Sequence, residues 1–502
     1  MKVIVFALNG CPAGWLGAYG NDWVGTPHLD RLAAEAVTFD RHISDRPEPN
    51  AARAAWMGRP TPPAPLPEGK GESSVLPSPL AGEGGESEDR VRGETLAHSR
   101  CHPSPVGEAP PPSPARGEGE DTSPSLQGGG WGVGLRSILV RANHPDTDGP
   151  DWFYAGWGEV FDARPRAEDA SPLEQLLRTF PALLDRLADV DDFLLWIDTD
   201  RLIPPWDVQQ DVFEAYVEDG EEEADYPDAH DDEVNQDEDS QDAGEEGAED
   251  SGDEEDVEYV DEVEEPDADE PPPAIEEEPI TPFADPPTGP FDRSDIDAWD
   301  WLHRTFAAVV TKLDAELGGL FDELRARGLD QSAAWVVTSD FGHPLGEHGQ
   351  IGLHRPWLHE ELVHLPLFLR LPGAEQAGRR VAGFTQPPDL YPTLLALLGA
   401  TQPDAPGFNL LPLARGEGPS ARAFAVTTLE LGDASEIALR TDDSALLVPT
   451  RVPEGDPLRE PLLFEKPDDR WEVNDLRPRS VERADELEAK LRDTLQRPER
   501  GA

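Results

Sequence analysis

Residues 332–373, SAAWVVTSDFGHPLGEHGQIGLHRPWLHEELVHLPLFLRLPG, decide how the chain folds. An apolar, β-branched run at residues 334–337 ends shortly before Asp340, and a second apolar run covers residues 363–371. The first run is typical of a buried parallel strand, and open α/β sheets place their ligands at the carboxyl ends of such strands. The loop after Asp340 concentrates groups that can bind metal or move protons: His343, Glu347, His348 and His354.

The rest of the chain supplies further elements of an α/β sheet. Residues 2–8 and 193–198 are short, continuous apolar runs of the kind buried on both faces, and the second ends in the carboxylate of Asp198. Residues 295–329 have the spacing of a long amphipathic helix. We therefore predict a doubly wound α/β domain with helices on both faces of its sheet, followed by a small α+β C-terminal subdomain.

Two segments differ in composition from the rest. Residues 61–130 are dominated by Pro, Gly, Ser and Glu, and residues 217–290 are acidic, with 33 Asp and Glu and no Lys or Arg between positions 217 and 280. Such compositions bury too little apolar surface to offset chain entropy, so we expect a disordered insertion and a disordered linker. They divide the α/β domain into residues 1–60, 131–216 and 291–400, and leave residues 401–502 for the C-terminal subdomain.

The net charge of −63 limits the kinds of partner that the chain can bind. A chain this acidic is not expected to bind nucleic acid or an anionic membrane. No apolar run is long enough to cross a bilayer, and the two cysteines imply no disulfide framework. The apolar run at positions 3–8 is shorter than the roughly 7–15 residues of a signal-peptide core, so we predict a first strand there and a cytoplasmic protein.

Several stretches resemble the sulfatase family of the alkaline-phosphatase superfamily. TSDFGHPLGEHG (residues 338–349) is similar to that family's TSDHG…GEHG segment, and LFEKPDDRWEVNDL (residues 463–476) is similar to its C-terminal signature. The resemblance implies hydrolysis of sulfate esters. It also implies a formylglycine nucleophile made from Cys or Ser in a C/S-x-P-S-R motif, a calcium ion on acidic and amide ligands, and lysines and histidines that handle charge and proton.

The nucleophile position departs from the family pattern. Aligning on Arg53 gives the motif Pro49-Asn50-Ala51-Ala52-Arg53, so proline stands where the nucleophile belongs. Shifting by one residue offers only Asn50, and moving back to Ser44 breaks the spacing to Arg53. We predict that the nucleophile is absent.

The metal positions are also incomplete. The family's first acidic pair falls on Asn9 and Gly10, and in the later pair Asp340 is kept while Phe341 replaces Asn or His. A hard dication normally takes six or more oxygen ligands with substantial negative charge. Asn9 and Asp340 are therefore interpreted as vestigial metal ligands, and we expect no cofactor. Calcium is expected only if the site is functional.

Among the proton-transfer positions, His348 and His354 persist beside Arg53, whereas the family's lysine and one histidine fall on Leu353 and Ile203. Apolar replacements suggest a site refilled as core, because polar groups without their metal and substrate are costly to bury. Two roles stay open for the surviving residues. One is structural, with Arg53 paired to Asp340 and His348 bonded to loop carbonyls, and the other is a retained pocket for an anionic sulfate or phosphate ester.

The sequence thus predicts a sulfatase-family protein with little or no hydrolytic activity and a binding or scaffold role. An active hydrolase of sulfate or phosphate esters with an atypical site is the alternative. A functionless degraded copy is a third possibility. The sequence names no protein partner.

Overall fold

The computed structural model describes residues 1–59, 135–144, 149–164, 171–223, 281–420, 422–453 and 460–496. The predicted insertion at residues 61–130 lies outside this range, as does most of the acidic segment. At the edges of that segment the predicted linker was too long. Helix α5 (Gln210–Glu223) runs through its first residues, and β6 (Gly289–Pro290) pairs with β8 (Gln350–Ile351) at its end.

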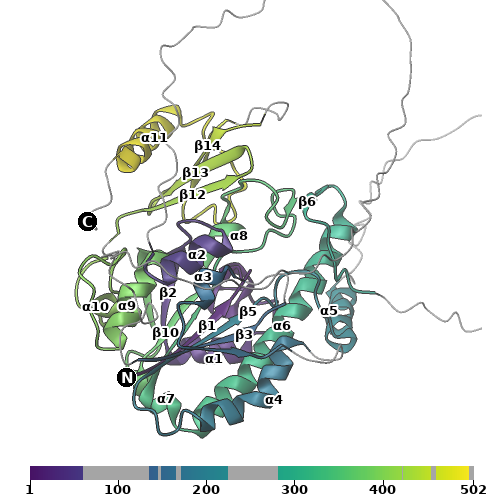
Figure 1. Cartoon of the computed structure of the whole chain (residues 1–502). Helices are drawn as coiled ribbons and strands as arrows, with labels where there is room; N and C mark the ends of the chain where they lie inside the picture. The colour runs from purple at the N-terminus through teal and green to yellow at the C-terminus, as the bar shows by residue number, and fades with distance from the viewer. Residues whose placement is uncertain are drawn as a thin grey trace, which may run out of the picture.

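The core of the fold is a mixed sheet with strand order β11-β2-β10-β7-β1-β5-β3-β4 and a short β9 beside β2 (Figure 1). Strands β7, β1, β5, β3 and β4 are mutually parallel, whereas β10 is antiparallel to both of its neighbours. The α/β class is therefore confirmed. The strands are β1 (Lys2–Leu8), β2 (Val37–Ile43), β3 (Arg136–Ala142), β4 (Glu159–Asp162), β5 (Phe193–Thr199), β7 (Ala333–Thr338), β9 (His364–Leu365), β10 (Leu367–Arg370) and β11 (Arg379–Thr385).

Strand β1 is apolar on both faces because each face lies against helices. Ile4, Phe6 and Leu8 belong to one core, and Val3 and Val5 belong to the other. On the first face, Phe6 meets Phe321 of the long helix edge-on, with ring centroids 5.2 Å apart. The helices on that face include α1 (Pro27–Glu35), α4 (Pro172–Asp185) and α6 (Ile296–Ala326), and those on the opposite face include α2 (Pro49–Trp56), α3 (Asp151–Tyr154), α9 (Leu390–Leu397) and α10 (Leu411–Arg415) (Figure 1).

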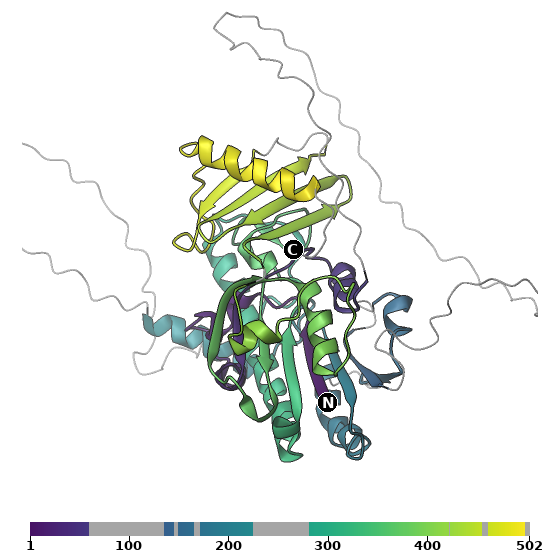
Figure 2. The same cartoon turned by 90° about the vertical axis from the view of Figure 1, so that its left-hand side faces the viewer.

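A second, four-stranded antiparallel sheet forms the C-terminal subdomain, with α11 (Val481–Gln496) on its outer face (Figure 2). Its inner face packs on the main domain through residues such as Ala438 and Phe464. The predicted boundary at residue 401 was too early, because α10 packs into the core of the main domain. The strands are β12 (Ala425–Leu431), β13 (Ala434–Arg440), β14 (Ser444–Arg451) and β15 (Leu462–Glu465).

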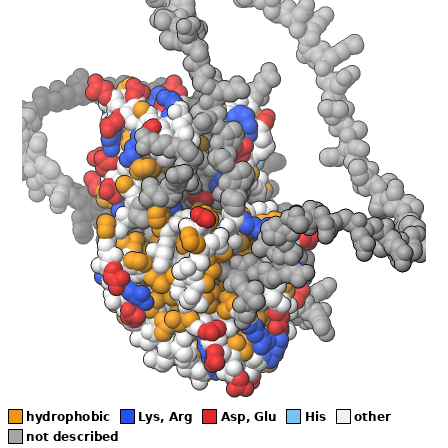
Figure 3. Space-filling view, turned by 60° about the vertical axis from the view of Figure 1, so that its left-hand side comes forward, with side chains coloured by type: hydrophobic (Ala, Val, Ile, Leu, Met, Phe, Trp, Pro, Cys, Tyr) orange, Lys and Arg blue, Asp and Glu red, His pale blue; other side chains and the backbone are white. Residues whose placement is uncertain are grey.

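The described surface carries both signs of charge. On the face in Figure 3, acidic and basic side chains are interspersed among apolar ones. Within the described residues, no helix is both long and apolar enough to cross a membrane.

Candidate functional site

Asp340 follows β7 and is buried at the carboxyl end of the parallel strands, as predicted, with 1% of its surface exposed. Its Oδ1 atom accepts hydrogen bonds from the backbone amides of Gly10 (3.1 Å) and Phe341 (2.9 Å). Its Oδ2 atom has no hydrogen-bond partner among the described residues. Burial raises the pKa of Asp340 to about 7, although the charge of Arg53 opposes this shift.

Arg53 forms its ion pair with Asp198, at the end of β5, rather than with Asp340. Its Nη2 lies 3.2 Å from Asp198 Oδ2, and both side chains are almost fully buried. Asn9 donates from Nδ2 to the other oxygen of Asp198 at 3.0 Å. The predicted pairing of Arg53 with Asp340 was therefore wrong. Burial disfavours the Arg53 cation, but Asp198 and then Asp340 outweigh it and raise the pKa of Arg53.

Asp198 is the residue of this cluster to which sequence reasoning assigned no role. The available signal was the carboxylate at the end of the apolar run 193–198, which belongs to the same edge of the sheet as Asp340. The cluster of Asn9, Arg53, Asp198 and Asp340 is thus drawn from the ends of three neighbouring strands and from helix α2.

Pro49 is the first residue of helix α2, where a missing amide hydrogen costs nothing and the fixed φ suits the helix. The N-cap residue is Glu48, and its side chain makes no capping bond. Arg53, one turn later, is covered by the segment after β3, with its guanidinium carbon 5.5 Å from the ring centroid of Phe153. Helix α2 therefore places Arg53 in the interior of the domain, and its first residue, Pro49, has no nucleophilic atom.

Ile203 occupies the space beside Gly10. A Cβ atom built on Gly10 would lie 2.4 Å from Ile203 Cδ1, and the φ of Gly10, +78°, lies in the left-handed region that disfavours other residues. The position that resembles the family's second acidic ligand thus has neither a side chain nor the room for one.

The three apolar replacements lie in one hydrophobic cluster between the two sheets. Phe341 is 7% exposed and is part of the cluster, and the partly buried Ile203 and Leu353 pack against it. The other members include Ile43, Leu358, Leu362 and Phe464. The prediction that these positions pack as core is confirmed.

The donors that remain do not fit a calcium ion. Within the cluster of Asn9, Arg53, Asp198 and Asp340, the oxygen atoms without a hydrogen-bond partner among the described residues are Asn9 Oδ1 and Asp340 Oδ2, whereas Asp198 is engaged by Asn9 and by the Arg53 cation. Calcium takes six to eight oxygens and is repelled by a neighbouring guanidinium. In the part of the chain that the structure describes, no group of three or more His, Cys, Asp or Glu is arranged to hold a metal ion.

His348 lies in a different place, at the interface with the C-terminal subdomain. Its Nδ1 is 2.8 Å from Glu361 Oε1, and its Nε2 is 3.2 Å from the carbonyl oxygen of Glu472. The predicted bond to a carbonyl is present, but the carbonyl belongs to the C-terminal subdomain, and the bond to the Glu361 carboxylate was not foreseen. Burial lowers the pKa of His348, but Glu361 and Glu472 outweigh it and raise the value to about 9.

The predicted site residues therefore fall into two groups. Asn9, Arg53 and Asp340 come together, whereas no hydrogen bond or ion pair among the described residues joins His348 to them. His354 is exposed in the loop that follows β8. What the geometry defines is an α/β protein with a small buried polar cluster at the sheet edge where such folds bind their ligands.

Comparisons with known proteins agree with this class. The sulfatase family profile matches residues 221–400. Arylsulfatase K of Canis lupus familiaris is 32% identical over 127 residues, covering 25% of this chain and 23% of that protein. N-acetylglucosamine-6-O-sulfatase of Bacteroides thetaiotaomicron is 34% identical over 116 residues, covering 23% and 20%. The chain thus spans about a fifth to a quarter of the length of these curated relatives.

The fold extends the likeness over almost the whole chain. The phosphonate monoester hydrolase of Agrobacterium radiobacter superposes with a TM-score of 0.56, covering 98% of this chain and 96% of its own, at 14% identity. Over residues 221–400 the chain is thus similar in sequence to the sulfatase family, and its fold is similar to that of solved hydrolases of this type.

Proposed function

We propose that this protein is a sulfatase-family member in which ester hydrolysis is lost or greatly reduced, and that its fold serves a binding or scaffold role. The observation that carries the proposal is the contact between Ile203 and Gly10. A methyl group of Ile203 stands where a ligand side chain on residue 10 would begin. An ion held at that point would meet hydrocarbon on one side.

The chemistry of ester hydrolysis supports the same conclusion. Hydrolysis of a sulfate ester requires a nucleophile in line with the S–O bond, positive charge on the non-bridging oxygens and an acid for the leaving oxygen. Pro49 supplies no nucleophile. The charge of Arg53 is neutralised by Asp198 at 3.2 Å, and His348 is bonded through both of its ring nitrogens.

An active hydrolase with an atypical site is the second candidate, and one observation favours it. The oxygen atoms Asn9 Oδ1 and Asp340 Oδ2 are buried without a hydrogen-bond partner among the described residues, and such atoms usually have one. For either function the ligand class we propose is an anionic sulfate or phosphate ester. Support comes from the buried Arg53 and from relatives whose names describe sulfate-ester hydrolases.

Calcium content and turnover separate the two functions. We expect the purified full-length chain to carry less than one calcium per chain by elemental analysis. We also expect it to hydrolyse an aryl sulfate and an aryl phosphate no faster than its Asp340→Asn variant does. One calcium per chain, together with a rate that Asp340→Asn abolishes, establishes the active hydrolase instead.

A gain-of-function experiment tests the same proposal from the other side. Pro49→Cys, expressed together with a formylglycine-generating enzyme, restores one missing part of the site. We expect no sulfatase activity above that of the matched Pro49→Ala variant, because the ligands for the metal are still missing. Turnover by Pro49→Cys alone contradicts the idea of a refilled site.

A further inference from the structure

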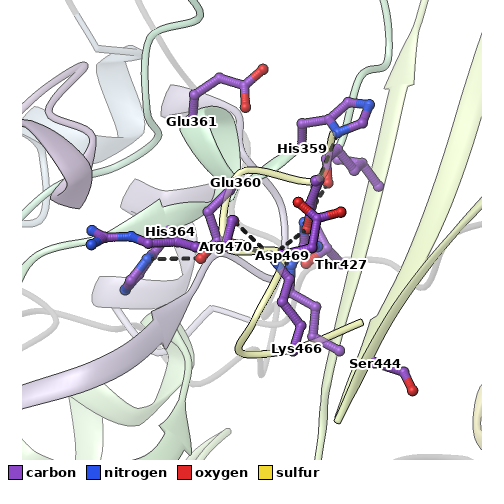
Figure 4. Close-up of polar contacts among 12 residues, drawn as sticks. His359, Glu360, Glu361, His364, Thr427, Ser444, Lys466, Asp469 and Arg470 are labelled. Carbon is purple, nitrogen blue, oxygen red and sulfur yellow. Dashed lines mark hydrogen bonds and ion pairs between the residues drawn. The ribbon is translucent and has the colours of Figure 1, made fainter. Parts of the chain in front are cut away.

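The interface between the main domain and the C-terminal subdomain contains a buried network of charged side chains. It joins helix α8 (Glu360–Val363), the loop that carries His348 and the segment after β15. Figure 4 shows part of it, with Glu360 between His364 and Lys466. None of these residues takes part in the Asn9–Arg53–Asp198–Asp340 cluster.

The hydrogen bonds of His348 fix its charge. Nδ1 faces a carboxylate oxygen of Glu361 at 2.8 Å, and Nε2 faces the carbonyl oxygen of Glu472 at 3.2 Å. A carbonyl oxygen and an ionised carboxylate only accept, so both ring nitrogens must donate. A neutral imidazole carries one N–H and an imidazolium carries two. The geometry therefore calls for an imidazolium.

The neighbouring histidine is placed as a neutral partner. The ring of His359 stacks on His348 with centroids 3.8 Å apart and planes 13° apart. Its Nδ1 lies 2.9 Å from Glu472 Oε2, while its buried Nε2 has no hydrogen-bond partner in the described part of the chain. A single N–H on Nδ1 accounts for both observations, and two stacked cations at this distance would repel.

Glu472 binds both rings, one through its carbonyl and one through its carboxylate. The carboxylate is also 2.8 Å from Arg440 Nη2 and 3.2 Å from Lys466 Nζ, and the residue is 1% exposed. Its φ of +56° lies in the left-handed region, which residues other than glycine rarely adopt. The surrounding contacts hold the backbone in this conformation.

The charge of His348 is needed to balance the other side of the interface. Glu361 is 5% exposed, and burial together with the nearby Glu361 charge raises the pKa of Glu347 to about 8. The nearby cations Arg440 and Lys466 pair with Glu472 and Glu360, and His364 pairs with Glu360. Without a charged His348, the Glu361 carboxylate would be buried without a cation partner among the described residues, which is strongly unfavourable.

We infer that His348 is a fixed imidazolium that ties the C-terminal subdomain to the main domain through Glu472. Both of its N–H groups are committed, so it neither gives nor takes a proton near neutral pH. The inference concerns the architecture of the interface, and it stands whether or not the protein hydrolyses esters.

Nitrogen NMR of the full-length chain with ¹⁵N-labelled histidine tests the charge, with the His348 signals assigned from their loss in His348→Gln. We expect both ring nitrogens of His348 to keep the shifts of protonated nitrogen from pH 6 to 8. In Glu361→Gln we expect its titration midpoint to move to lower pH. A titration near the ordinary histidine value of about 6.5, or the shift pattern of a neutral tautomer at pH 7, overturns the inference.

Hydrogen exchange tests the tie itself. In His348→Gln we expect amide exchange of residues 466–473 to speed up about tenfold or more, as loss of a charge-assisted bond predicts. The matched control is His354→Gln in the same loop, where the side chain is exposed, and it should leave this exchange unchanged. If His348→Gln does not fold, Glu361→Gln gives the same reading. Equal exchange rates of residues 466–473 in the test and control variants overturn the inference that His348 holds the C-terminal subdomain to the main domain.

Discussion

Arg53 and Asp198 form a buried ion pair 3.2 Å long between helix α2 and the end of strand β5. The guanidinium has lost access to solvent, and the Asp340 carboxylate nearby is not its hydrogen-bond partner. The polar cluster is therefore organised around Asp198 and holds its elements together through charge.

Removing the anion of this pair should destabilise the fold. We expect Asp198→Ala to lower the free energy of unfolding by about 3 kcal/mol, because it leaves a buried cation with only the more distant Asp340. Urea unfolding measures the change. The double variant Arg53→Met/Asp198→Ala should recover part of the loss. An additive double variant would show that the two residues do not interact.

The contact between Gly10 and Ile203 predicts coupling between substitutions at the two positions. Gly10→Ala should destabilise by about 2 kcal/mol, through the left-handed φ and the overlap with Ile203. In the background of Ile203→Ala the overlap is relieved, so the same substitution should cost at least about 1 kcal/mol less. Equal costs in both backgrounds would mean that Ile203 does not fill the space beside Gly10.

The raised pKa of Asp340 predicts that the stability of the protein depends on pH at mildly acid pH. Burial raises its folded-state pKa to about 7, so the folded state binds the proton more tightly than the unfolded chain does. The stabilisation from this group is complete below the unfolded pKa of about 3.9 and is lost as the pH rises to 7. Relative to Asp340→Asn, wild type should lose up to about 4 kcal/mol between pH 4 and 8. A constant difference in unfolding free energy across this range contradicts the raised pKa.

His348 predicts a loss of stability at alkaline pH. Its folded-state pKa is raised to about 9, so its contribution is complete below the unfolded value of about 6.5 and is lost as the pH rises through 9. The free energy of unfolding of wild type, measured by thermal unfolding, should therefore decline more steeply between pH 7 and 10 than that of His348→Gln. The difference between the two declines should reach up to about 3 kcal/mol. Parallel curves would indicate that the ring is neutral in the folded protein.

Much of the fold could be predicted because its strands are short apolar runs with clear ends. The runs at 2–8, 193–198 and 334–337 became the three central strands, and the helical spacing at 295–329 became α6. Strand β2 was missed because its residues VTFDRHI mix apolar and charged side chains, and it also places His42 in the core. Such a strand depends on its neighbours rather than on its own periodicity.

The site was predicted only in part, because sequence identifies residue types and not partners. Asp340 was expected at the carboxyl end of its strand, whereas Arg53 and Asn9 were named from the family resemblance, and the three lie together in the structure. The choice between Asp198 and Asp340 as the partner of Arg53 depended on the direction in which α2 points its side chain. The role of His348 depended on Glu472, which lies 124 positions further along the chain. Contacts of this range leave no local pattern.

The two sides of the acidic stretch are joined inside the folded domain. The amide of Trp206 donates to the carbonyl of Ala284 at 2.7 Å, and the hydroxyl oxygens of Tyr216 and Thr311 share a hydrogen bond at 2.6 Å. A protease that cuts once between residues 224 and 280 would separate the chain into two polypeptides whose strands interleave in one sheet. The nicked protein should migrate as a single particle until it is denatured.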